Sequence, residues 1–292
     1  PMTAQVLEPF TPQALLIPTC EAILRVYNQH GNRKNRFWAR LKFLVRDWGM
    51  EKFRLEVLRI RDKLRPMPIN PFAMVADDAT PVKSSPTPSA VVDTQYETWV
   101  SANCLNTVDP IQVAVWVHCE LGEISPAQLR SLAEISSRCG AMEVRTSNAQ
   151  QFLLRCISRN ELPSLYSQLK TAGLAAPRSI HSVKVTRCSG GENCPSSITT
   201  SKNMAAALCQ MLESNYGNGH ASIDLRVSGC PHGCSHHHLA DIGLQGMARR
   251  TSGKTVPCYR FMIGGGTGEG RAHFAKAVAV VPACRASDAV LT

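Results

Sequence analysis

The sequence predicts an α+β fold in which a helical segment precedes two parts that mix strands and helices. Three observations support this fold class. Residues 11–65 repeat apolar side chains at helical spacing, residues 66–95 carry six of the eighteen prolines, and from residue 96 onward strand and helix patterns alternate. A stretch rich in Pro, Ser and Thr does not bury a core and indicates a linker. We therefore divide the chain into residues 1–65, 66–95, 96–180 and 181–292.

The first part of the chain is expected to form packing helices. Thr11 and Pro12 fit the N-cap and first position of a helix, and Gly31 fits the residue that follows its end. The stretches 32–49 and 51–64 again place apolar side chains three and four residues apart. This spacing predicts two further amphipathic helices.

The third part has the pattern strand, helix, strand, strand, helix. Residues 111–119 form a β-branched and apolar run, and residues 124–140 begin with Ser-Pro and continue with helical spacing. Residues 141–157 read as two strands around a polar turn, and residues 161–174 as a short helix. This order is that of a split ferredoxin-like unit.

Composition limits the classes of partner. The chain has 32 basic and 22 acidic residues, a net charge of +10, which suits an acidic redox partner or an anionic substrate. It contains no recognisable nucleic-acid-binding motif, so nucleic acid is not expected as a partner. No apolar run reaches the length of a membrane span, and the start PMTAQVLEPF lacks the features of a secretory signal. Twelve cysteines without secretion signals indicate a reducing, cytoplasmic location.

Four cysteines form two close pairs in loops rich in Gly, Ser, Pro and Asn. Cys188 and Cys194 have the spacing C-x5-C, and Cys230 and Cys234 the spacing C-x3-C. Disulfides, a structural zinc site and a [4Fe–4S] cluster are three alternatives for these thiols. C-x5-C is wider than the common zinc-knuckle spacing, and nothing in the sequence indicates an oxidising compartment. Four cysteines are the usual ligands of a [4Fe–4S] cluster, which we favour.

The second pair lies in SGCPHGCSHHHLADIGLQG, and the two pairs together resemble the motif of the assimilatory nitrite and sulfite reductases. The resemblance implies that Cys188, Cys194, Cys230 and Cys234 bind a [4Fe–4S] cluster. It also implies that Cys234 bridges to the iron of siroheme, a tetrapyrrole with eight carboxylates, and takes part in catalysis. His232 departs from the pattern, because the family more often has Asn there.

Two further stretches resemble the same family and suggest contacts to siroheme. RKNRFWARLKFLVRDWGMEKFRLEV resembles the helical segment that ends the first half of these reductases, and Arg40 corresponds to a basic residue that contacts siroheme. A strand ending in Arg-Thr before a Gln-rich turn resembles the ferredoxin-like half-domain, so Arg145 and Gln150 are candidate contacts. An arginine fork fits a carboxylate with two hydrogen bonds. The fold implied is a ferredoxin-like half-domain followed by a siroheme- and cluster-binding α/β domain.

The resemblance implies a six-electron reduction of nitrite to ammonia or of sulfite to sulfide. The residues ADIGLQG lean toward nitrite. Reduced ferredoxin or a flavoprotein would supply the electrons. The resemblance covers nearly all of this chain but only part of the usual family length, with a first ferredoxin-like half expected before Pro1, so we expect this polypeptide alone to be incomplete.

Other assignments remain open at this point. The chain could be an iron–sulfur electron-transfer module or a zinc-binding module without siroheme, or an enzyme similar to precorrin-3B synthase. His236, His237 and His238 are expected in a solvated or carboxylate-facing loop, because the bridging thiolate would already occupy one axial position of the tetrapyrrole iron. The glycines at 264–266 fit either a plain turn or a close approach to a tetrapyrrole.

Overall fold

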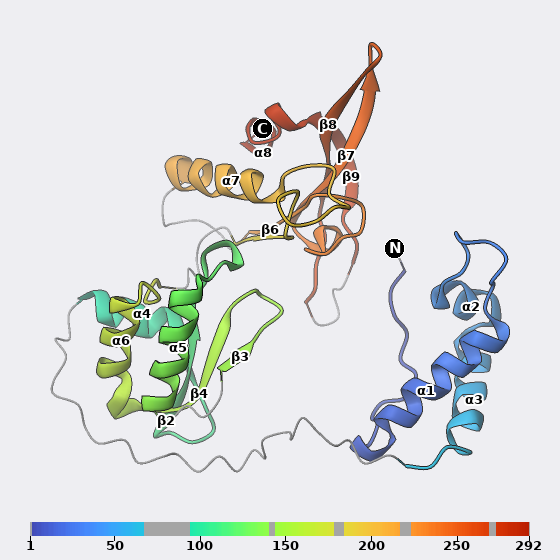
Figure 1. Cartoon of the computed structure of the whole chain (residues 1–292), viewed down its shortest axis with the longest axis horizontal. Coiled ribbons are helices and arrows are strands. Elements are labelled where there is room, and N and C mark those ends of the chain that lie inside the picture. The colour runs from blue at the N-terminus through green and yellow to red at the C-terminus, as the bar shows by residue number, and fades with distance from the viewer. Residues whose placement is uncertain are drawn as a thin grey trace. The chain divides into compact units, whose positions relative to one another are not determined.

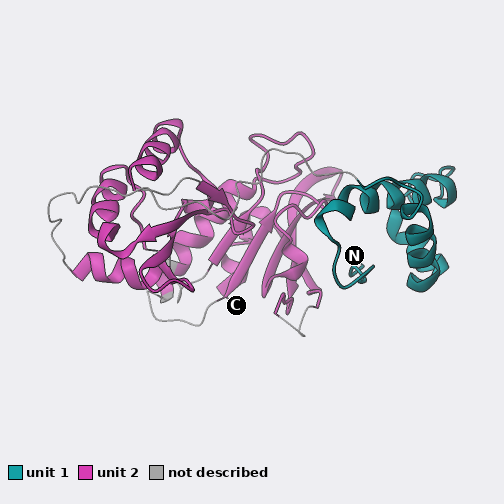
Figure 2. Cartoon of the chain, turned by 90° about the horizontal axis from the view of Figure 1, so that it is seen from below, with its two compact units in different colours: residues 1–79 teal, residues 80–292 magenta. Residues whose placement is uncertain are grey.

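The computed structural model describes residues 2–66, 94–139, 144–177, 184–216, 223–268 and 273–291. The predicted linker at 66–95 therefore lies almost entirely outside the described residues. The chain divides into two compact units, residues 1–79 and 80–292, which are coloured separately in Figure 2. The finer four-part division stays a prediction.

The first unit is helical, as its periodicity predicts. It contains α1 (Gln13–His30), α2 (Leu41–Trp48) and α3 (Met50–Arg61), shown at the blue end of Figure 1. The three helices share a small apolar core: Ala22, Val26, Leu44, Phe53, Val57 and Ile60. Each helix is short of apolar surface on its own, so this shared core is what makes the unit compact.

The ends of these helices differ from the prediction for physical reasons. Pro12, and not Thr11, is the cap of α1, because the Thr11 hydroxyl donates to Glu8 instead. The second helix begins only at Leu41. Before it, the side chain of Asn32 accepts the backbone N–H groups of residues 34 and 35, and Asn35 accepts that of residue 37. Such local hydrogen bonds compete with helix formation.

The second unit begins with a four-stranded antiparallel sheet. Its order is β1-β2-β4-β3, with α5 and α6 packed against it around a core that includes Trp99, Leu154 and Leu165 (Figure 1). The elements are α4 (Thr94–Asn103), β1 (Cys104–Asn106), β2 (Gln112–Val117), η1 (Glu120–Gly122), α5 (Pro126–Arg138), β3 (Val144–Thr146), β4 (Phe152–Ser158), η2 (Arg159–Glu161) and α6 (Leu162–Thr171).

This sheet has the predicted ferredoxin-like order, with one addition. β1, which precedes β2 in sequence, occupies the position beside β2 where the last strand of a complete ferredoxin-like unit would lie. Neither α4 nor β1 was predicted from the sequence. The capping box at Ser125 and Gln128 starts α5 at the Ser-Pro signal that the sequence contains.

A five-stranded mixed sheet follows, in the order β5-β6-β7-β8-β9. β5, β6 and β7 are parallel, whereas β7, β8 and β9 are antiparallel, and α7 connects β5 to β6. The elements are β5 (Lys184–Arg187), α7 (Ser201–Tyr216), β6 (Asp224–Ser228), η3 (His237–Leu239), β7 (Ile242–Thr251), β8 (Lys254–Ile263), β9 (Lys276–Pro282), η4 (Ala283–Arg285) and α8 (Asp288–Leu291).

The second sheet has its own apolar core, in which Leu208 of α7 packs with Leu225, Leu244 and Phe261 from the strands. Among the described residues, no helix is both long enough and apolar enough to cross a membrane.

Candidate metal centre

The two cysteine pairs follow two neighbouring parallel strands. Cys188 comes directly after β5, and Cys230 lies two residues after β6. The strand register pairs Arg187 with Val227, and the Cys188 amide donates to the Val227 carbonyl at 3.0 Å. Because the carboxyl ends of parallel strands lie at one edge of a sheet, both cysteine loops emerge at the same edge, the usual place for a ligand in such sheets.

Gly229 joins the two loops. Its N–H group donates to the Cys188 sulfur at 3.2 Å, and its carbonyl accepts the N–H groups of Ile198 and Thr199 at 2.7 and 3.0 Å. A Cβ at this position would lie 2.1 Å from the Ser197 hydroxyl oxygen, so only glycine allows this approach. The first loop, which carries Cys194, is thereby fixed to the second.

The four cysteines differ in exposure. Cys230 is buried, Cys188 and Cys194 are half-buried, and Cys234 is exposed after the left-handed Gly233 (φ +74°). None of the twelve cysteines is paired in a disulfide. Within the described residues, no three Cys, His, Asp or Glu side chains could hold a single metal ion together. A four-iron cubane instead attaches each thiolate to a different iron, and four thiols on two joined loops are the donor set that it needs.

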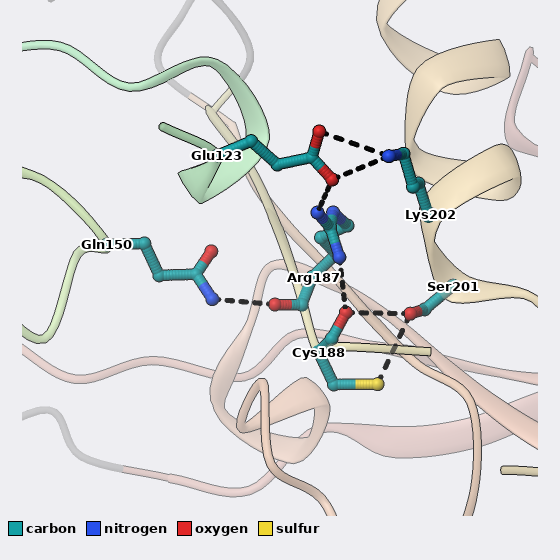
Figure 3. Close-up of polar contacts among 6 residues, drawn as sticks. All are labelled: Glu123, Gln150, Arg187, Cys188, Ser201 and Lys202. Carbon is teal, nitrogen blue, oxygen red and sulfur yellow. Dashed lines mark hydrogen bonds and ion pairs between the residues drawn. The ribbon is translucent and has the colours of Figure 1, made fainter. Parts of the chain in front are cut away.

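The first cysteine and five residues around it form a polar network (Figure 3). Arg187 is buried and pairs with Glu123, and its guanidinium donates to the Cys188 carbonyl at 3.0 Å. Lys202 Nζ lies 2.8 Å from Glu123 Oε1. The hydrogen bond from Lys202, followed by the charge of Arg187, lowers the pKa of Glu123. Ser201 donates its hydroxyl to the Cys188 carbonyl at 2.8 Å.

Gln150, one of the predicted siroheme contacts, hydrogen-bonds to the residue directly before Cys188. It sits in the turn between β3 and β4, and its side-chain amide donates to the Arg187 carbonyl at 2.7 Å (Figure 3). It also lines a groove of about 670 Å³ together with Gly122, Glu123, Arg187 and Cys188. Sequence reasoning missed Glu123 and Arg187, because no motif marks a pair that forms only through the tertiary fold.

The other two predicted siroheme contacts are surface residues. Arg145 is exposed on β3, five residues before Gln150 in the same hairpin. Arg40 is exposed immediately before α2 and belongs to the unit of residues 1–79. Their roles toward siroheme stay predictions.

The histidine loop differs from the prediction at one residue. His236 is exposed and His238 is half-buried, but His237 is only 4% exposed, so of the expected solvated or carboxylate-facing positions the solvated one is wrong for His237. Its Nδ1 atom is buried and has no hydrogen-bond partner among the described residues. Burial, with the neighbouring charge of His238, lowers the pKa of His237 to about 4.

The glycines after β8 have a local structural reason. Gly264 is left-handed (φ +76°), and the Gly265 amide donates to the Ala240 carbonyl at 2.9 Å. A Cβ on Gly265 would lie 2.6 Å from that carbonyl oxygen. The backbone of this turn therefore packs closely on the residue that follows the histidine loop.

Comparisons with known proteins point in one direction. A family model described as "Nitrite and sulphite reductase 4Fe-4S domain" matches residues 1–64 and 181–291. A second, "Nitrite/Sulfite reductase ferredoxin-like half domain", matches residues 111–172.

Individual relatives agree with these family models. "Sulfite reductase [ferredoxin] 2" of Mycolicibacterium paratuberculosis is 29% identical over 92% of this chain and 46% of that protein. "Ferredoxin--nitrite reductase" of Synechococcus elongatus is 26% identical over 87% of this chain and 45% of that protein. The solved structure of Mycobacterium tuberculosis NirA superposes with a TM-score of 0.73 at 25% identity, covering 99% of this chain and 50% of that chain. The chain thus spans about half the length of the relatives it matches.

Replacing Gly229 by alanine should separate the two cysteine loops. The added methyl group would overlap the Ser197 side chain and approach the Thr199 carbonyl to 2.7 Å, and such overpacking costs about 1–3 kcal/mol. Denaturant unfolding of the Gly229→Ala chain measures this loss. Gly191→Ala is the matched control, because its Cβ would meet nothing closer than 3.8 Å. Equal stabilities of the two variants would contradict the role given to Gly229.

Acidification should weaken the fold through His237. Its pKa is about 4 in the folded chain against an ordinary 6.5, so between these values the unfolded chain binds a proton that the folded chain does not. The free energy of unfolding should therefore fall as the pH decreases from about 6.5 to about 4. In the His237→Gln chain, which cannot take up this proton, unfolding curves across the same window should show a smaller decrease. An unchanged pH dependence would contradict the buried neutral imidazole.

Proposed function

This chain belongs to the nitrite and sulfite reductase family, and on that premise we propose that it carries the cluster and siroheme site of an enzyme that reduces one of these anions. Family membership confirms the resemblance found in the sequence, together with the α+β fold class and the family's two cofactors, a [4Fe–4S] cluster and siroheme. The observation that supports the proposed site most directly is the emergence of both cysteine pairs at one edge of the sheet, after β5 and β6.

In the proposed site, Cys188, Cys194, Cys230 and Cys234 are the four cluster ligands. The N–H group of Gly229 donates to the Cys188 sulfur, and a donor aimed at a thiolate stabilises its negative charge. The first turn of α7 begins at Ser201, whose hydroxyl lies 3.3 Å from the same sulfur. A helix N-terminus favours a neighbouring anion, so this side of the site suits an anionic iron–sulfur cage.

Cys234 is the proposed ligand shared with the siroheme iron. Its exposure distinguishes it from the buried Cys230 on the same loop, and a shared thiolate has to be accessible to the second cofactor. When bound, the coupled cluster and siroheme would supply electrons one at a time to an anion, chemistry that no side chain can provide. The chain's own contribution is to hold the sulfur atoms and to orient the tetrapyrrole.

Arg40, Arg145 and Gln150 are the proposed partners of siroheme carboxylates. The two arginine side chains are exposed, and the guanidinium fork of an arginine fits a carboxylate with two hydrogen bonds. Gln150 donates one amide hydrogen to the Arg187 carbonyl, so the second hydrogen of the same amide is the donor proposed for a carboxylate. A tetrapyrrole with eight carboxylates needs such donors from several segments of the protein.

The proposed reaction is the six-electron reduction of nitrite to ammonia or of sulfite to sulfide. The residues ADIGLQG resemble the nitrite reductases and the mixed nitrite/sulfite group more than the sulfite reductases, which favours nitrite. The relatives include proteins named for each anion. Reduced ferredoxin is the proposed electron donor, since it appears in the names of both groups of relatives, and a flavoprotein is the second candidate. Because the chain covers about half of each relative, the complete reaction is proposed for an enzyme that contains this chain.

Iron uptake tests the ligand assignment. Anaerobic reconstitution of the chain with iron and sulfide should give about four irons per chain and the broad visible absorption of a cubane cluster. Cys234→Ser should lose most of this iron, because one of the four thiolates is gone. Cys284→Ser, which alters another exposed cysteine, should retain it. A chain that takes up no iron would overturn the proposed function.

Product analysis tests the choice of anion. An enzyme that contains this chain, loaded with siroheme and supplied with reduced ferredoxin, should form ammonia from nitrite at a higher kcat/KM than sulfide from sulfite. The reverse order would assign the enzyme to sulfite. The Cys234→Ser enzyme serves as the negative control for both anions.

A further inference from the structure

One carboxylate of the ferredoxin-like half-domain contacts both segments that surround the first cysteine (Figure 3). Glu123 lies between η1 and α5. It pairs with Arg187, the last residue of β5, and with Lys202 in the first turn of α7, at 2.8 Å from Nζ. The carboxylate thereby connects the end of β5, directly before Cys188, with the start of α7, directly after Ser201.

The burial of Arg187 gives this contact its importance. A half-exposed pair such as that of Glu123 with Lys202 contributes little to stability by itself, because solvent screens the two charges. The Arg187 side chain, in contrast, is 8% exposed, and a buried cation is strongly unfavourable without its counter-charge. The same guanidinium donates to the Cys188 carbonyl. The position of Glu123 therefore controls a group that touches the backbone of Cys188.

The remaining backbone groups around the first cysteine are also engaged. The Arg187 carbonyl accepts from Gln150, and the Cys188 carbonyl accepts from Ser201 as well as from Arg187. The Cys188 amide donates to the Val227 carbonyl. With both carbonyls and the amide fixed, the sulfur is held where it accepts the N–H group of Gly229.

The two loops that reach from the half-domain are strained where they make these contacts. Leu121 (φ +49°) and Gln150 (φ +59°) adopt left-handed backbone conformations, which are uncommon for residues other than glycine. Between them, Gly122 approaches Gln150 so closely that a Cβ would lie 2.9 Å from the Gln150 Cβ. Leu121 packs against the core of the second sheet. Such strain persists only where surrounding contacts fix it, and it concentrates at functional sites.

We propose that Glu123 and Gln150 are positioning residues for the first cluster cysteine, Cys188, so that the ferredoxin-like half-domain sets how firmly the cluster is held and at which potential it is reduced. This inference rests on the proposed function, because it takes Cys188 as a cluster ligand. Outer partners that orient a metal ligand commonly change metal affinity by about 10- to 100-fold. Hydrogen bonds to the sulfur atoms also adjust the reduction potential of a cluster.

Iron release measures the firmness of the site. In the cluster-loaded, siroheme-free chain, Glu123→Gln should release iron to a chelator about tenfold faster than the unaltered chain, because Arg187 loses its counter-charge. Glu134→Gln is the matched control: Glu134 forms an exposed pair with Arg138, with side chains about two-thirds exposed, and its replacement should leave the rate unchanged.

The reduction potential separates positioning from general stability. Gln150→Ala changes no charge, and without siroheme no contact to a tetrapyrrole carboxylate contributes. A looser Cys188 would lose part of its hydrogen bond from Gly229, so a redox titration of the Gln150→Ala chain should give a lower potential than the unaltered chain. Unchanged potential in Gln150→Ala, together with unchanged iron release in Glu123→Gln, would overturn the inference.

Thiol labelling of the iron-free chain tests the positioning of Cys188 without the cluster. Cys188 should react faster in Glu123→Gln than in the unaltered chain, while Cys230, which is 5% exposed, stays protected and shows that the variant is folded. If Cys230 is also labelled in Glu123→Gln, that variant is not folded. Cys188 labelling is then compared between Gln150→Ala and the unaltered chain. Equal Cys188 labelling in a folded variant contradicts positioning, whereas absence of iron from the unaltered chain contradicts the proposed function instead.

Discussion

The parallel pairing of β5 with β6 is the constraint on which the cysteine site depends. Had these strands been antiparallel, the ends that carry Cys188 and Cys230 would lie at opposite edges of the sheet. Parallel strands require a crossover connection, and α7 supplies it while packing Leu208 into the core of the same sheet. Because α7 connects β5 to β6, it allows the two strands to run parallel, so that Cys230 after β6 emerges at the same edge as Cys188 after β5.

The sequence predicted the features that depend on neighbours along the chain. Cysteine spacing and the Ser-Pro start of the helix expected at 124–140 are local patterns, and the structure begins α5 at this Ser-Pro signal, with Ser125 as its cap. The late start of α2 was missed because Asn32 and Asn35 satisfy backbone N–H groups that a helix would otherwise use. Helical spacing of apolar side chains does not report this competition.

Features that depend on tertiary contacts could not be predicted from the sequence. His237 is buried because its loop folds back over Gly243, where a Cβ would lie 1.9 Å from the His237 carbonyl oxygen. A run of three histidines is expected to be exposed to solvent, and nothing in the neighbouring sequence indicates which of the three rings is buried. Glu123 and Arg187 are likewise ordinary charged residues until the fold places them together.

Cys188 and Cys234 differ in how firmly the surrounding residues hold them. The Cys188 carbonyl accepts from Arg187 and Ser201 and the Cys188 amide donates to the Val227 carbonyl, whereas Cys234 is exposed beside a left-handed glycine. In the proposed site, a cluster ligand needs a fixed sulfur, while a sulfur shared with a second cofactor has to remain accessible. The hydrogen bonds that hold Cys188 come from Arg187, Ser201, Val227 and Gly229, and none of them involves Cys234. The first cysteine is therefore held while the proposed shared thiol stays exposed.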